Sequence, residues 1–451
     1  MWKVVFPERL YYEIQEFLFS TAPHENGCYV TANTWMNKSD AGRFVVTGYC
    51  KPEPDSWKRR GEHSLEPSSE YINKCVLQAD NNGETLIFIH THPNPSHPAT
   101  FSAVDTETNQ RIFANLTQIL DGRPLGSLVF SREEIAGVAF FDGVEYDISS
   151  VKVVGSTYSE IPTFQFIKQG SRIDPKFDRQ TRVVGQEKQR EIQNLKAAII
   201  GVGGTGSSVA VQLARMGAKE LVLVDMDNVD ATNVTRLHGS KTKDIGRSKV
   251  EVVADYIAGF SKAKVTPIAF SITDADKQPQ IISHLLDSDV IFGCTDTLAS
   301  RAVLNDVSIQ YYIPYIDVGC RILVDKECLV AQSIAKVQLV TPDHACLWCT
   351  GILDGSQITL ETYPEMEKGK LAKEGYYQGT VKQPSTISLT TLGGSLAVNS
   401  LMGLLGVYGP DYPTMTQIEL RNSFIVSETP PIKSDCICKK RRGIGSRRRV
   451  A

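Results

Sequence analysis

Residues 197–206 read Ala-Ala-Ile-Ile-Gly-Val-Gly-Gly-Thr-Gly, and this stretch decides the fold of the second half of the chain. The apolar run at its start has the length of a buried strand, and helical spacing follows its end. A tight turn between the two, and a close approach of backbone amides to a phosphate, are permitted by Gly201, Gly203, Gly204 and Gly206. The stretch therefore predicts a nucleotide-binding strand–turn–helix unit.

Strand-like and helical segments alternate beyond this turn. The strands are expected at 221–225, 264–270, 290–294 and 314–318, and the helices at 248–258 and 299–310. Such a rhythm is typical of a Rossmann-like α/β fold with a doubly wound, mostly parallel sheet. Asp225 ends the second strand, where an acidic residue holds ribose hydroxyls. Up to this point ATP and NAD fit equally well.

Length and composition indicate two soluble domains. A chain of 451 residues exceeds one ordinary domain, and its 41% hydrophobic and 22% charged residues are typical of globular proteins. The first half mixes strand and helix patterns, which predicts an α+β domain. We expect this domain at 1–155, a linker with an arginine-containing segment at 156–182, the nucleotide-binding domain at 183–438 and a basic tail at 439–451.

The charge balance limits the class of partner. A net charge of -3 argues against binding to nucleic acid or a membrane surface by the chain as a whole. Seven Lys and Arg lie between Lys439 and Arg449 without an acid; a solvated tail is the simpler interpretation, and contact with nucleic acid or an acidic partner is the alternative. No segment has the pattern of a signal peptide or a membrane span, so we expect a cytoplasmic protein with reduced cysteines.

Polar residues downstream of the turn separate ATP from NAD. They form the ordered set Asp225, Asp227, Asn233, Arg236, Lys249 and Asp296. With the glycine turn, this set resembles the ThiF/MoeB/ubiquitin-activating superfamily, and the resemblance covers roughly residues 177–438. It implies an adenylyltransferase that uses ATP and Mg to activate the Gly-Gly-type C-terminus of a ubiquitin-like or sulfur-carrier protein. A conjugating enzyme is a further partner that the resemblance allows.

The resemblance also implies a role for each charged residue. Attack of a carboxylate on the α-phosphate meets charge repulsion, which Arg236, Lys249 and Mg would offset. Asp296 would hold Mg, a cation that prefers oxygen ligands. The segment ending at Arg182 resembles the superfamily's arginine motif, with Gln180 where the superfamily usually has Tyr. Arg182 would then reach the ATP phosphates of the other subunit in a homodimer.

Two cysteine pairs predict a structural zinc site. Cys346 and Cys349 have the usual spacing of a zinc knuckle, and Cys436 and Cys438 form a second pair with one residue less than the superfamily normally shows. Four thiolates suit tetrahedral zinc. The alternatives are unliganded reduced cysteines, or Asp435 as a substitute ligand.

A missing cysteine bears on the reaction. Relatives that pass their substrate on as a thioester use a cysteine after the first zinc pair, but none lies between Cys349 and Cys436. The chain reads Pro-Ser-Thr at residues 384–386, and a hydroxyl is a poorer nucleophile than a thiolate. We therefore expect a MoeB-like enzyme that stops at the acyl-adenylate.

The first half carries a pattern for a second zinc site. A strand expected at 85–90 leads into His90 and His92, and alternate residues of a strand face the same side. Asp105 follows near the start of a helix. Two imidazoles and one carboxylate leave a fourth zinc position open for water, which is typical of a catalytic site.

With Glu25 upstream and Ser102 one turn before Asp105, these residues resemble the JAB/JAMM (Mov34/MPN-like) metalloprotease family over about residues 1–150. The resemblance implies that Glu25 shuttles the proton and that Ser102 stabilises the oxyanion during cleavage after a ubiquitin-like C-terminus. Nine residues separate His92 from Ser102 where the family usually has seven, so the register of Ser102 is less secure.

Three functions follow from these patterns. The first is a bifunctional enzyme that adenylates a carrier protein and also cleaves (iso)peptide bonds after it. The second is a ThiF-type activator whose JAB-like domain is inactive and binds the carrier. The third is an NAD-dependent oxidoreductase.

Overall fold

The structure is a computed structural model, and it describes residues 1–37, 40–94, 99–167, 173–327, 329–363, 367 and 384–446. Contacts divide the chain into two compact units. Unit 1 consists of Met1–Gln169 with Gln310–Tyr312 and Arg441–Ala451, and unit 2 consists of Gly170–Ile309 and Ile313–Lys440.

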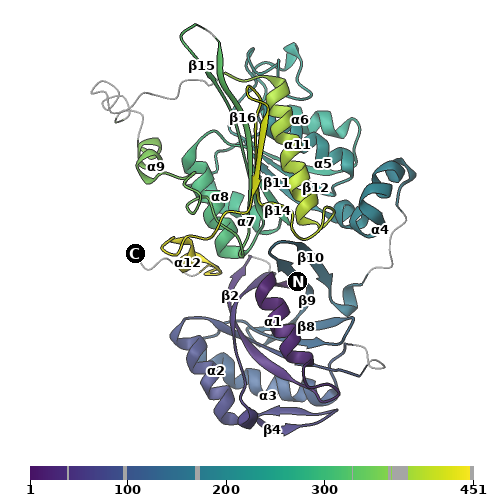
Figure 1. Ribbon diagram of the computed structural model, residues 1–451. Helices are drawn as coiled ribbons and strands as arrows, with labels where there is room; N and C mark the ends of the chain where they lie inside the picture. Colours follow the sequence, from purple (N-terminus) through teal and green to yellow (C-terminus); the bar gives the residue numbers. More distant parts are fainter. Residues whose placement is uncertain are drawn as a thin grey trace. The chain divides into compact units, whose positions relative to one another are not determined.

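Unit 1 is a mixed sheet flanked by helices (Figure 1). Its strands are β1 (Trp2–Pro7), β2 (Gly27–Met36), β3 (Gly42–Cys50), β6 (Thr85–Thr91), β7 (Leu125–Phe130), β8 (Ile135–Phe141), β9 (Val144–Val154) and β10 (Tyr158–Pro162), with the separate hairpin β4 (Trp57–Arg60) and β5 (Leu65–Pro67). The helices are α1 (Glu8–Phe19), α2 (Ser69–Asn81) and α3 (Ala103–Ile119).

The strand order of unit 1 is β1-β3-β2-β6-β7-β8-β9-β10, and β1 also pairs with β9, so the sheet closes on itself like a barrel. Alternating apolar residues of β1, β2 and β9 form the core that α1 covers, with Trp2 and Phe6 fully buried. The closure and helix α2 were not predicted from the sequence. Strand β10 lies in the segment expected to be a linker, where it pairs with β9.

Unit 2 contains the predicted Rossmann-like sheet (Figure 1). Its strands are β11 (Lys196–Ile200), β12 (Glu220–Val224), β13 (Lys264–Ile268), β14 (Val290–Gly293), β15 (Tyr315–Val324), β16 (Val330–Val340), β17 (Met415–Glu419) and β18 (Phe424–Glu428). Its helices are α4 (Asp178–Asn194), α5 (Gly204–Met216), α6 (Lys249–Ala258), α7 (Gln278–Leu286), α8 (Leu298–Tyr311), α9 (Gly355–Thr362), α11 (Ile387–Leu404) and α12 (Cys438–Arg441).

The sheet order is β13-β12-β11-β14-β15-β16-β17-β18. The first five strands are parallel, and chain order reverses direction between β11 and β14, which is where nucleotides bind in doubly wound sheets. The last three strands add antiparallel to β15. The predicted parallel arrangement therefore holds for the five strands from β13 to β15 and does not extend to β16, β17 and β18.

Helix α11 is the one helix in the described part of the chain that is long and apolar enough to cross a bilayer. About three-fifths of it is buried, 61%, because it packs on α5, β15 and β16. Gly393 and Gly394 allow the close approach, since an added Cβ would lie 2.4 Å from Cys320 Sγ and 2.8 Å from Ser208 Oγ. Its apolar composition is thus accounted for by packing inside unit 2.

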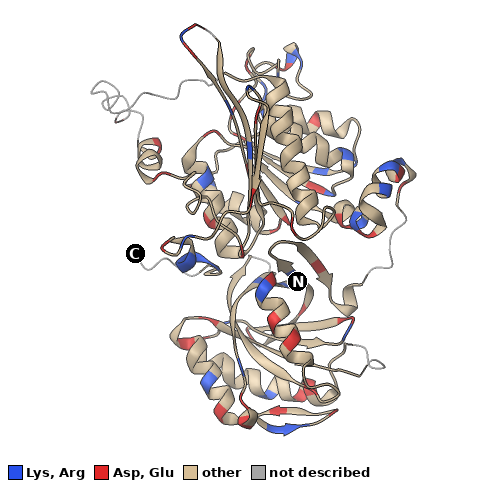
Figure 2. Cartoon of the chain, in the orientation of Figure 1, with Lys and Arg blue, Asp and Glu red and all other residues tan. Residues whose placement is uncertain are grey.

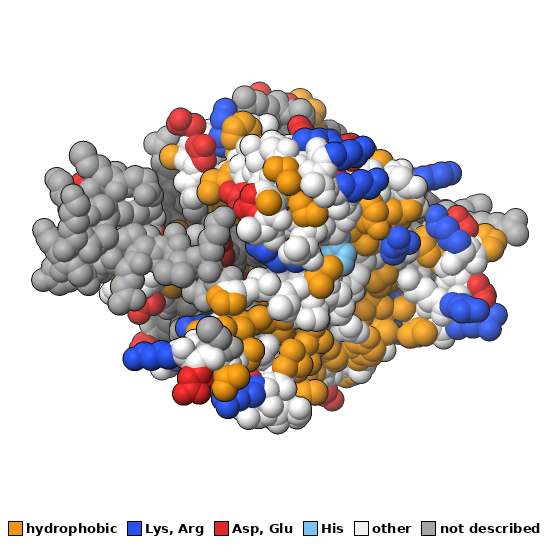
Figure 3. Space-filling view, turned by 90° about the horizontal axis from the view of Figure 1, so that it is seen from above, with side chains coloured by type: hydrophobic (Ala, Val, Ile, Leu, Met, Phe, Trp, Pro, Cys, Tyr) orange, Lys and Arg blue, Asp and Glu red, His pale blue; other side chains and the backbone are white. Residues whose placement is uncertain are grey.

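Strand β18 is an edge strand, and all five of its residues are exposed. Its large apolar side chains are among those that reach solvent, with Phe424 44% and Ile425 65% exposed. Figure 3 shows one face of the molecule on which hydrophobic side chains gather.

Candidate functional sites

The glycine turn joins β11 to α5 at the switch point of the sheet. Gly201 has a φ of +87°, and an added Cβ would lie 2.6 Å from the carbonyl oxygen of Cys294. A Cβ at Gly206 would lie 1.8 Å from the oxygen of Gly201. Both positions therefore exclude any side chain. An added Cβ at Gly203, in contrast, would meet nothing within 4 Å, which leaves open space at the start of α5 where a phosphate can approach the helix N-terminus.

Acidic residues after β12 fix this turn. Asp225 accepts hydrogen bonds from the amide of Val202 at 2.7 Å and from the amide of Asp227 at 2.9 Å. Burial raises the pKa of Asp225, an effect that the charge of Lys249 opposes. The Lys249 ammonium in turn donates to Asp227 Oδ2 at 2.6 Å. The structure thus brings Gly201, Asp225, Asp227 and Lys249 into one connected group.

Asp296 follows β14, the strand beside β11. The amide of Cys294 donates to the oxygen of Ile200 at 2.8 Å, so the loop that carries Asp296 starts next to the glycine turn. The carboxylate of Asp296 is exposed and makes no hydrogen bond or ion pair with the residues that the structure describes, although its charge acts on Arg301. It lines a recess of about 660 Å³ together with Arg321, Asp354 and Glu361. Asp296 is therefore free to bind a cation there.

A buried ion pair also contacts the loop that carries Asp296. Arg301, in the first turn of α8, donates to Asp317 Oδ2 at 3.0 Å and to the carbonyl oxygens of Thr295 and Val318 at 3.2 Å each. Tyr315 donates its hydroxyl to Asp317 Oδ1 at 2.6 Å. The side chains of Arg301 and Asp317 are 15% and 3% exposed. Neither Tyr315 nor Asp317 was singled out in the sequence; a lone acid inside the apolar run of β15 was the available signal.

Two buried hydroxyls favour a polar ligand at this edge of the sheet. Ser248 Oγ, beside Lys249, and Thr295 Oγ1, beside Asp296, have no hydrogen-bond partner within the described ranges. Buried hydroxyls without partners are costly unless a ligand or water satisfies them. The residues present therefore fit a nucleotide with its divalent cation.

Three other predicted residues are held by local contacts. Asn233 is buried and its amide donates to Asp230 within a turn, and Arg236 donates to the carbonyl oxygen of Thr232 in the same turn. Arg182, on α4, is exposed and pairs with Asp178 at 2.7 Å. Asn233 and Arg236 thus stabilise one turn, and Arg182 forms an ion pair within helix α4.

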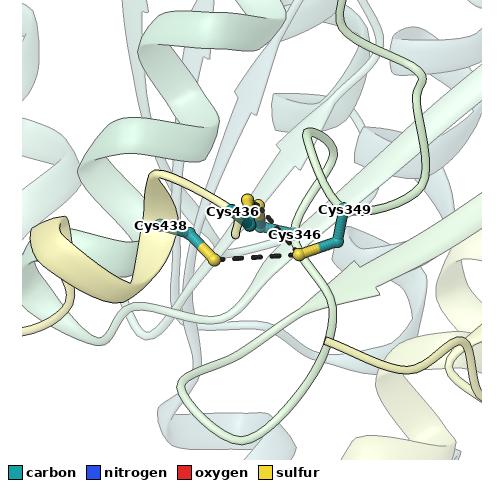
Figure 4. A group of neighbouring side chains, drawn as sticks. All are labelled: Cys346, Cys349, Cys436 and Cys438. Atoms are coloured by element: carbon teal, nitrogen blue, oxygen red, sulfur yellow. Dashed lines mark hydrogen bonds between the residues drawn. The ribbon is translucent and has the colours of Figure 1, made fainter. Parts of the chain in front are cut away.

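The four cysteines of unit 2 converge (Figure 4). Cys346 Sγ lies 3.8 Å from Cys349 Sγ and 3.7 Å from Cys436 Sγ, and Cys349 Sγ lies 3.7 Å from Cys438 Sγ. Ligands at about 2.3 Å from a tetrahedral zinc lie roughly 3.8 Å from one another, so these three distances fit zinc.

The shortened second cysteine pair is accommodated by α12, which begins at Cys438 and turns that thiol back into the cluster. Asp435, the alternative ligand, is exposed and is not part of the cluster. The basic residues that follow Cys438 on α12 are drawn in blue in Figure 2. The tail beyond residue 446 lies outside the described residues.

In unit 1 the predicted zinc ligands also converge. The ligand atoms of His90, His92 and Asp105 lie within 4.8 Å of one another. His90 Nε2 is 3.2 Å from Asp105 Oδ1, and His92 Nε2 is 3.5 Å from Asp105 Oδ2. His90 is buried, and both of its ring nitrogens lack a hydrogen bond with the described residues. A metal bound between the three side chains would take one of these nitrogens as a ligand.

Glu25 stands beside these ligands, with Oε1 3.9 Å from His92 Nε2. It is 7% exposed, and burial raises the pKa of its carboxyl to about 7, against the opposing charge of His92. Glu25, the two histidines and Asp105 line a cavity of about 460 Å³.

Two further contacts define this site. Ser102 caps α3, because its hydroxyl accepts from the amide of Asp105 at 3.1 Å. Residues 95–98, between His92 and Ser102, lie outside the described residues. The hairpin β4–β5 holds the backbone of Glu25: its amide donates to Gly61, and Arg60 Nε donates to its carbonyl oxygen at 3.1 Å. This role of Arg60 had no signal in the sequence.

Comparison with known proteins assigns the second half of the chain. Residues 177–439 match the ThiF family. Relatives include "Adenylyltransferase and sulfurtransferase MOCS3" of Caenorhabditis briggsae, 29% identical over 37% of this chain and 38% of the relative, and "Ubiquitin-like modifier-activating enzyme 5" of Drosophila virilis, 26% identical over 48% and 51%. A third is "tRNA threonylcarbamoyladenosine dehydratase" of Bacillus subtilis, 30% identical over 31% and 54%. The chain spans about half the length of these relatives or less.

Proposed function

The chain belongs to the ThiF family, and from this we propose that unit 2 is an adenylyltransferase that uses ATP and Mg to activate a C-terminal carboxylate of a ubiquitin-like or sulfur-carrier protein. The observation that carries the proposal is the group at the switch point of the sheet. There the open start of α5, the Lys249–Asp227 pair and the unpaired carboxylate of Asp296 lie at one edge.

Each residue has a task in this proposal. The amides at the start of α5 bind phosphate, and Asp225 holds the turn through Val202 and remains near the ribose. Lys249 and Arg236 place positive charge against the phosphates. Mg, held by Asp296, offsets the charge that develops on the α-phosphate. NAD-dependent oxidation is set aside, because the ThiF match covers the whole Rossmann-like segment.

The carrier is proposed from two kinds of support. One relative is named as an activator of a ubiquitin-like modifier and another as an adenylyltransferase and sulfurtransferase. The dehydratase shows that the family also includes an enzyme named for a modified tRNA. We favour a protein carrier ending in Gly-Gly, with the adenylate passed directly to another nucleophile, because no cysteine lies between Cys349 and Cys436.

Nucleotide binding and exchange test this proposal. Wild-type protein should bind ATP in a magnesium-dependent way by calorimetry and catalyse carrier-dependent ATP–pyrophosphate exchange. Asp296→Ala should abolish exchange. Asp276→Ala, an exposed aspartate of the same unit, is the matched control and should retain it. Wild-type protein that binds no magnesium–ATP contradicts the proposal.

A second function is proposed for unit 1, a zinc-dependent (iso)peptidase that cleaves after the carrier. It is favoured by the convergence of His90, His92 and Asp105 beside Glu25 in a cavity. Zinc bound there would supply an activated water. Glu25 would take the proton of that water. Ser102 caps α3 and also lines the same cavity, and we propose that it faces the oxyanion.

Zinc content and cleavage together separate an active unit 1 from an inactive carrier-binding module. Glu25→Gln should retain the zinc of unit 1 and lose cleavage of a linear carrier fusion, whereas His92→Ala should lose that zinc, leaving the one of the cysteine cluster, and should also lose cleavage. Glu62→Gln, a more distant residue of the same cavity, should keep both. Full cleavage by Glu25→Gln rules out the peptidase and leaves carrier binding as the function of this unit.

A further inference from the structure

The carboxyl edge of the unit 2 sheet holds four aspartates, and three of them are engaged inside the protein. Asp225 binds two backbone amides, Asp227 pairs with Lys249, and Asp317 pairs with Arg301 and accepts from Tyr315. Asp296 makes no hydrogen bond or ion pair through its carboxylate in the described part of the chain, although its charge acts on Arg301. Its position therefore depends on the backbone of its loop and on Arg301.

The contacts of Arg301 supply that control. The guanidinium donates to the carbonyl oxygen of Thr295, the residue directly before Asp296, and its own position is fixed by Asp317. Tyr315, which lies two residues before Asp317 on β15, donates its hydroxyl to the Asp317 carboxylate and so fixes its position. Since both charges are almost fully buried, the pair has little freedom to move: Asp317 is 3% exposed. The loop is also held at its other end, because Glu361 accepts from the amide of Ala299 at 2.8 Å.

We propose that the buried chain Tyr315–Asp317–Arg301 is a positioning device that sets the carboxylate of Asp296 for the magnesium of bound ATP. The three residues touch neither nucleotide nor metal in this proposal. They act through the Thr295 carbonyl, as outer-shell groups act on metal ligands generally. The inference rests on the proposed function of unit 2 and adds the residues that make its metal site rigid.

Two substitutions weaken the hydrogen bonds among Tyr315, Asp317 and Arg301 but keep a side chain of similar size at each position. Arg301→Lys keeps the buried charge but cannot donate to Asp317, Thr295 and Val318 together. Tyr315→Phe removes one hydroxyl and keeps the ring packed against Gly293. Matched controls in the same unit are Arg421→Lys, whose guanidinium donates to the carbonyl oxygen of Ala331, and Tyr412→Phe, whose ring packs on Gly403.

The test measures ATP affinity by calorimetry in magnesium and in EDTA, with Mn²⁺ binding to the ATP complex followed by electron paramagnetic resonance. Arg301→Lys should weaken metal-dependent affinity by roughly 10-fold or more, and Tyr315→Phe by a few fold, while affinity in EDTA stays at the wild-type value. The controls should match wild type in both conditions.

Two results overturn the proposed positioning role. One is wild-type metal dependence in both Arg301→Lys and Tyr315→Phe. The other is an equal loss of affinity with and without metal, which indicates general damage to the unit. Absence of magnesium-dependent ATP binding in the wild type is a different result, because it removes the proposed function of unit 2 and the positioning role with it.

Discussion

Lys249 Nζ lies 2.6 Å from Asp227 Oδ2, and this pair joins the start of α6 to the loop after β12. The lysine side chain is 10% exposed whereas the aspartate is 55% exposed, so the ammonium of Lys249 is largely shielded from solvent while its partner reaches it. A buried ammonium beside an open helix N-terminus is suited to a phosphate group.

Removal of this charge should weaken nucleotide binding. Lys249→Met keeps the length of the side chain, and we expect the dissociation constant for magnesium–ATP to rise by roughly 10- to 100-fold, since a charge-assisted hydrogen bond contributes about 1.5–3 kcal/mol. Calorimetry measures the constant directly. Lys264→Met, an exposed lysine on β13, is the control, and an unchanged constant for Lys249→Met excludes this lysine from the site.

The cysteine cluster should hold one zinc ion per chain in unit 2. Cys436→Ser is expected to lose that zinc and to lower the melting temperature by several degrees, because metal binding stabilises the folded state. Asp435→Asn should retain zinc if the four cysteines are the ligands. Metal analysis decides between them, and zinc loss from Asp435→Asn identifies the aspartate as a ligand.

Zinc loading should also release protons. Burial raises the pKa of the Cys436 thiol to about 11, and the neighbouring Cys438 thiol and burial raise the pKa of Cys346, so these two thiols are protonated at neutral pH without metal. Zinc binds thiolates, so its affinity should increase with pH. Titration in buffers of different ionisation enthalpy measures the protons released, and a release of zero means that the cluster does not bind zinc through thiolates.

Arg182 should act in trans if unit 2 works as a homodimer. Arg182→Ala and Asp296→Ala are each expected to abolish ATP–pyrophosphate exchange with a carrier that the wild type activates. A mixed dimer of the two variants contains one site with both residues intact, so mixing should restore part of the activity. Failure of mixing, with dimers confirmed by light scattering, assigns Arg182 to its own subunit or to no site.

An ion-pair cluster should make the stability of unit 1 depend on pH. Glu160 accepts from Ser150 and lies 3.1 Å from Lys3 Nζ and 3.8 Å from Lys152 Nζ. Burial opposes ionisation of Glu160, but the two lysines hold its pKa well below the ordinary value. A depressed pKa stabilises the folded state above the unfolded pKa of about 4.3, and this contribution is lost as the pH falls further.

Glu160→Gln should therefore destabilise unit 1 by roughly 1–3 kcal/mol near pH 7, because the buried Lys152 and the nearby Lys3 each lose an ionic contact with Glu160. The difference from wild type should shrink below about pH 4. Denaturation followed by tryptophan fluorescence reports mainly on unit 1, which contains Trp2, Trp35 and Trp57. Glu53→Gln, at an exposed pair with Lys74, should change stability little, and a difference independent of pH contradicts this explanation.

The sequence by itself determined the Rossmann-like half of unit 2, because strand and helix periodicities and a glycine turn are local signals. Only glycine fits at positions 201 and 206 of the turn, so these glycines in the sequence indicate the turn geometry. It likewise indicated both sets of candidate metal ligands, since paired cysteines and alternating histidines have characteristic spacings.

Only the tertiary structure decided which of these residues meet. The closure of β1 onto β9, the antiparallel strands β16–β18 and the buried chain from Tyr315 to Arg301 join segments distant in the sequence, and their pairing depends on packing that no local pattern records. The same holds for Arg60, whose contact with Glu25 arises because a separate hairpin reaches the loop before β2. Residue chemistry can be read along the chain, whereas the position of an unpaired carboxylate such as Asp296 is fixed by the neighbours that folding brings to it.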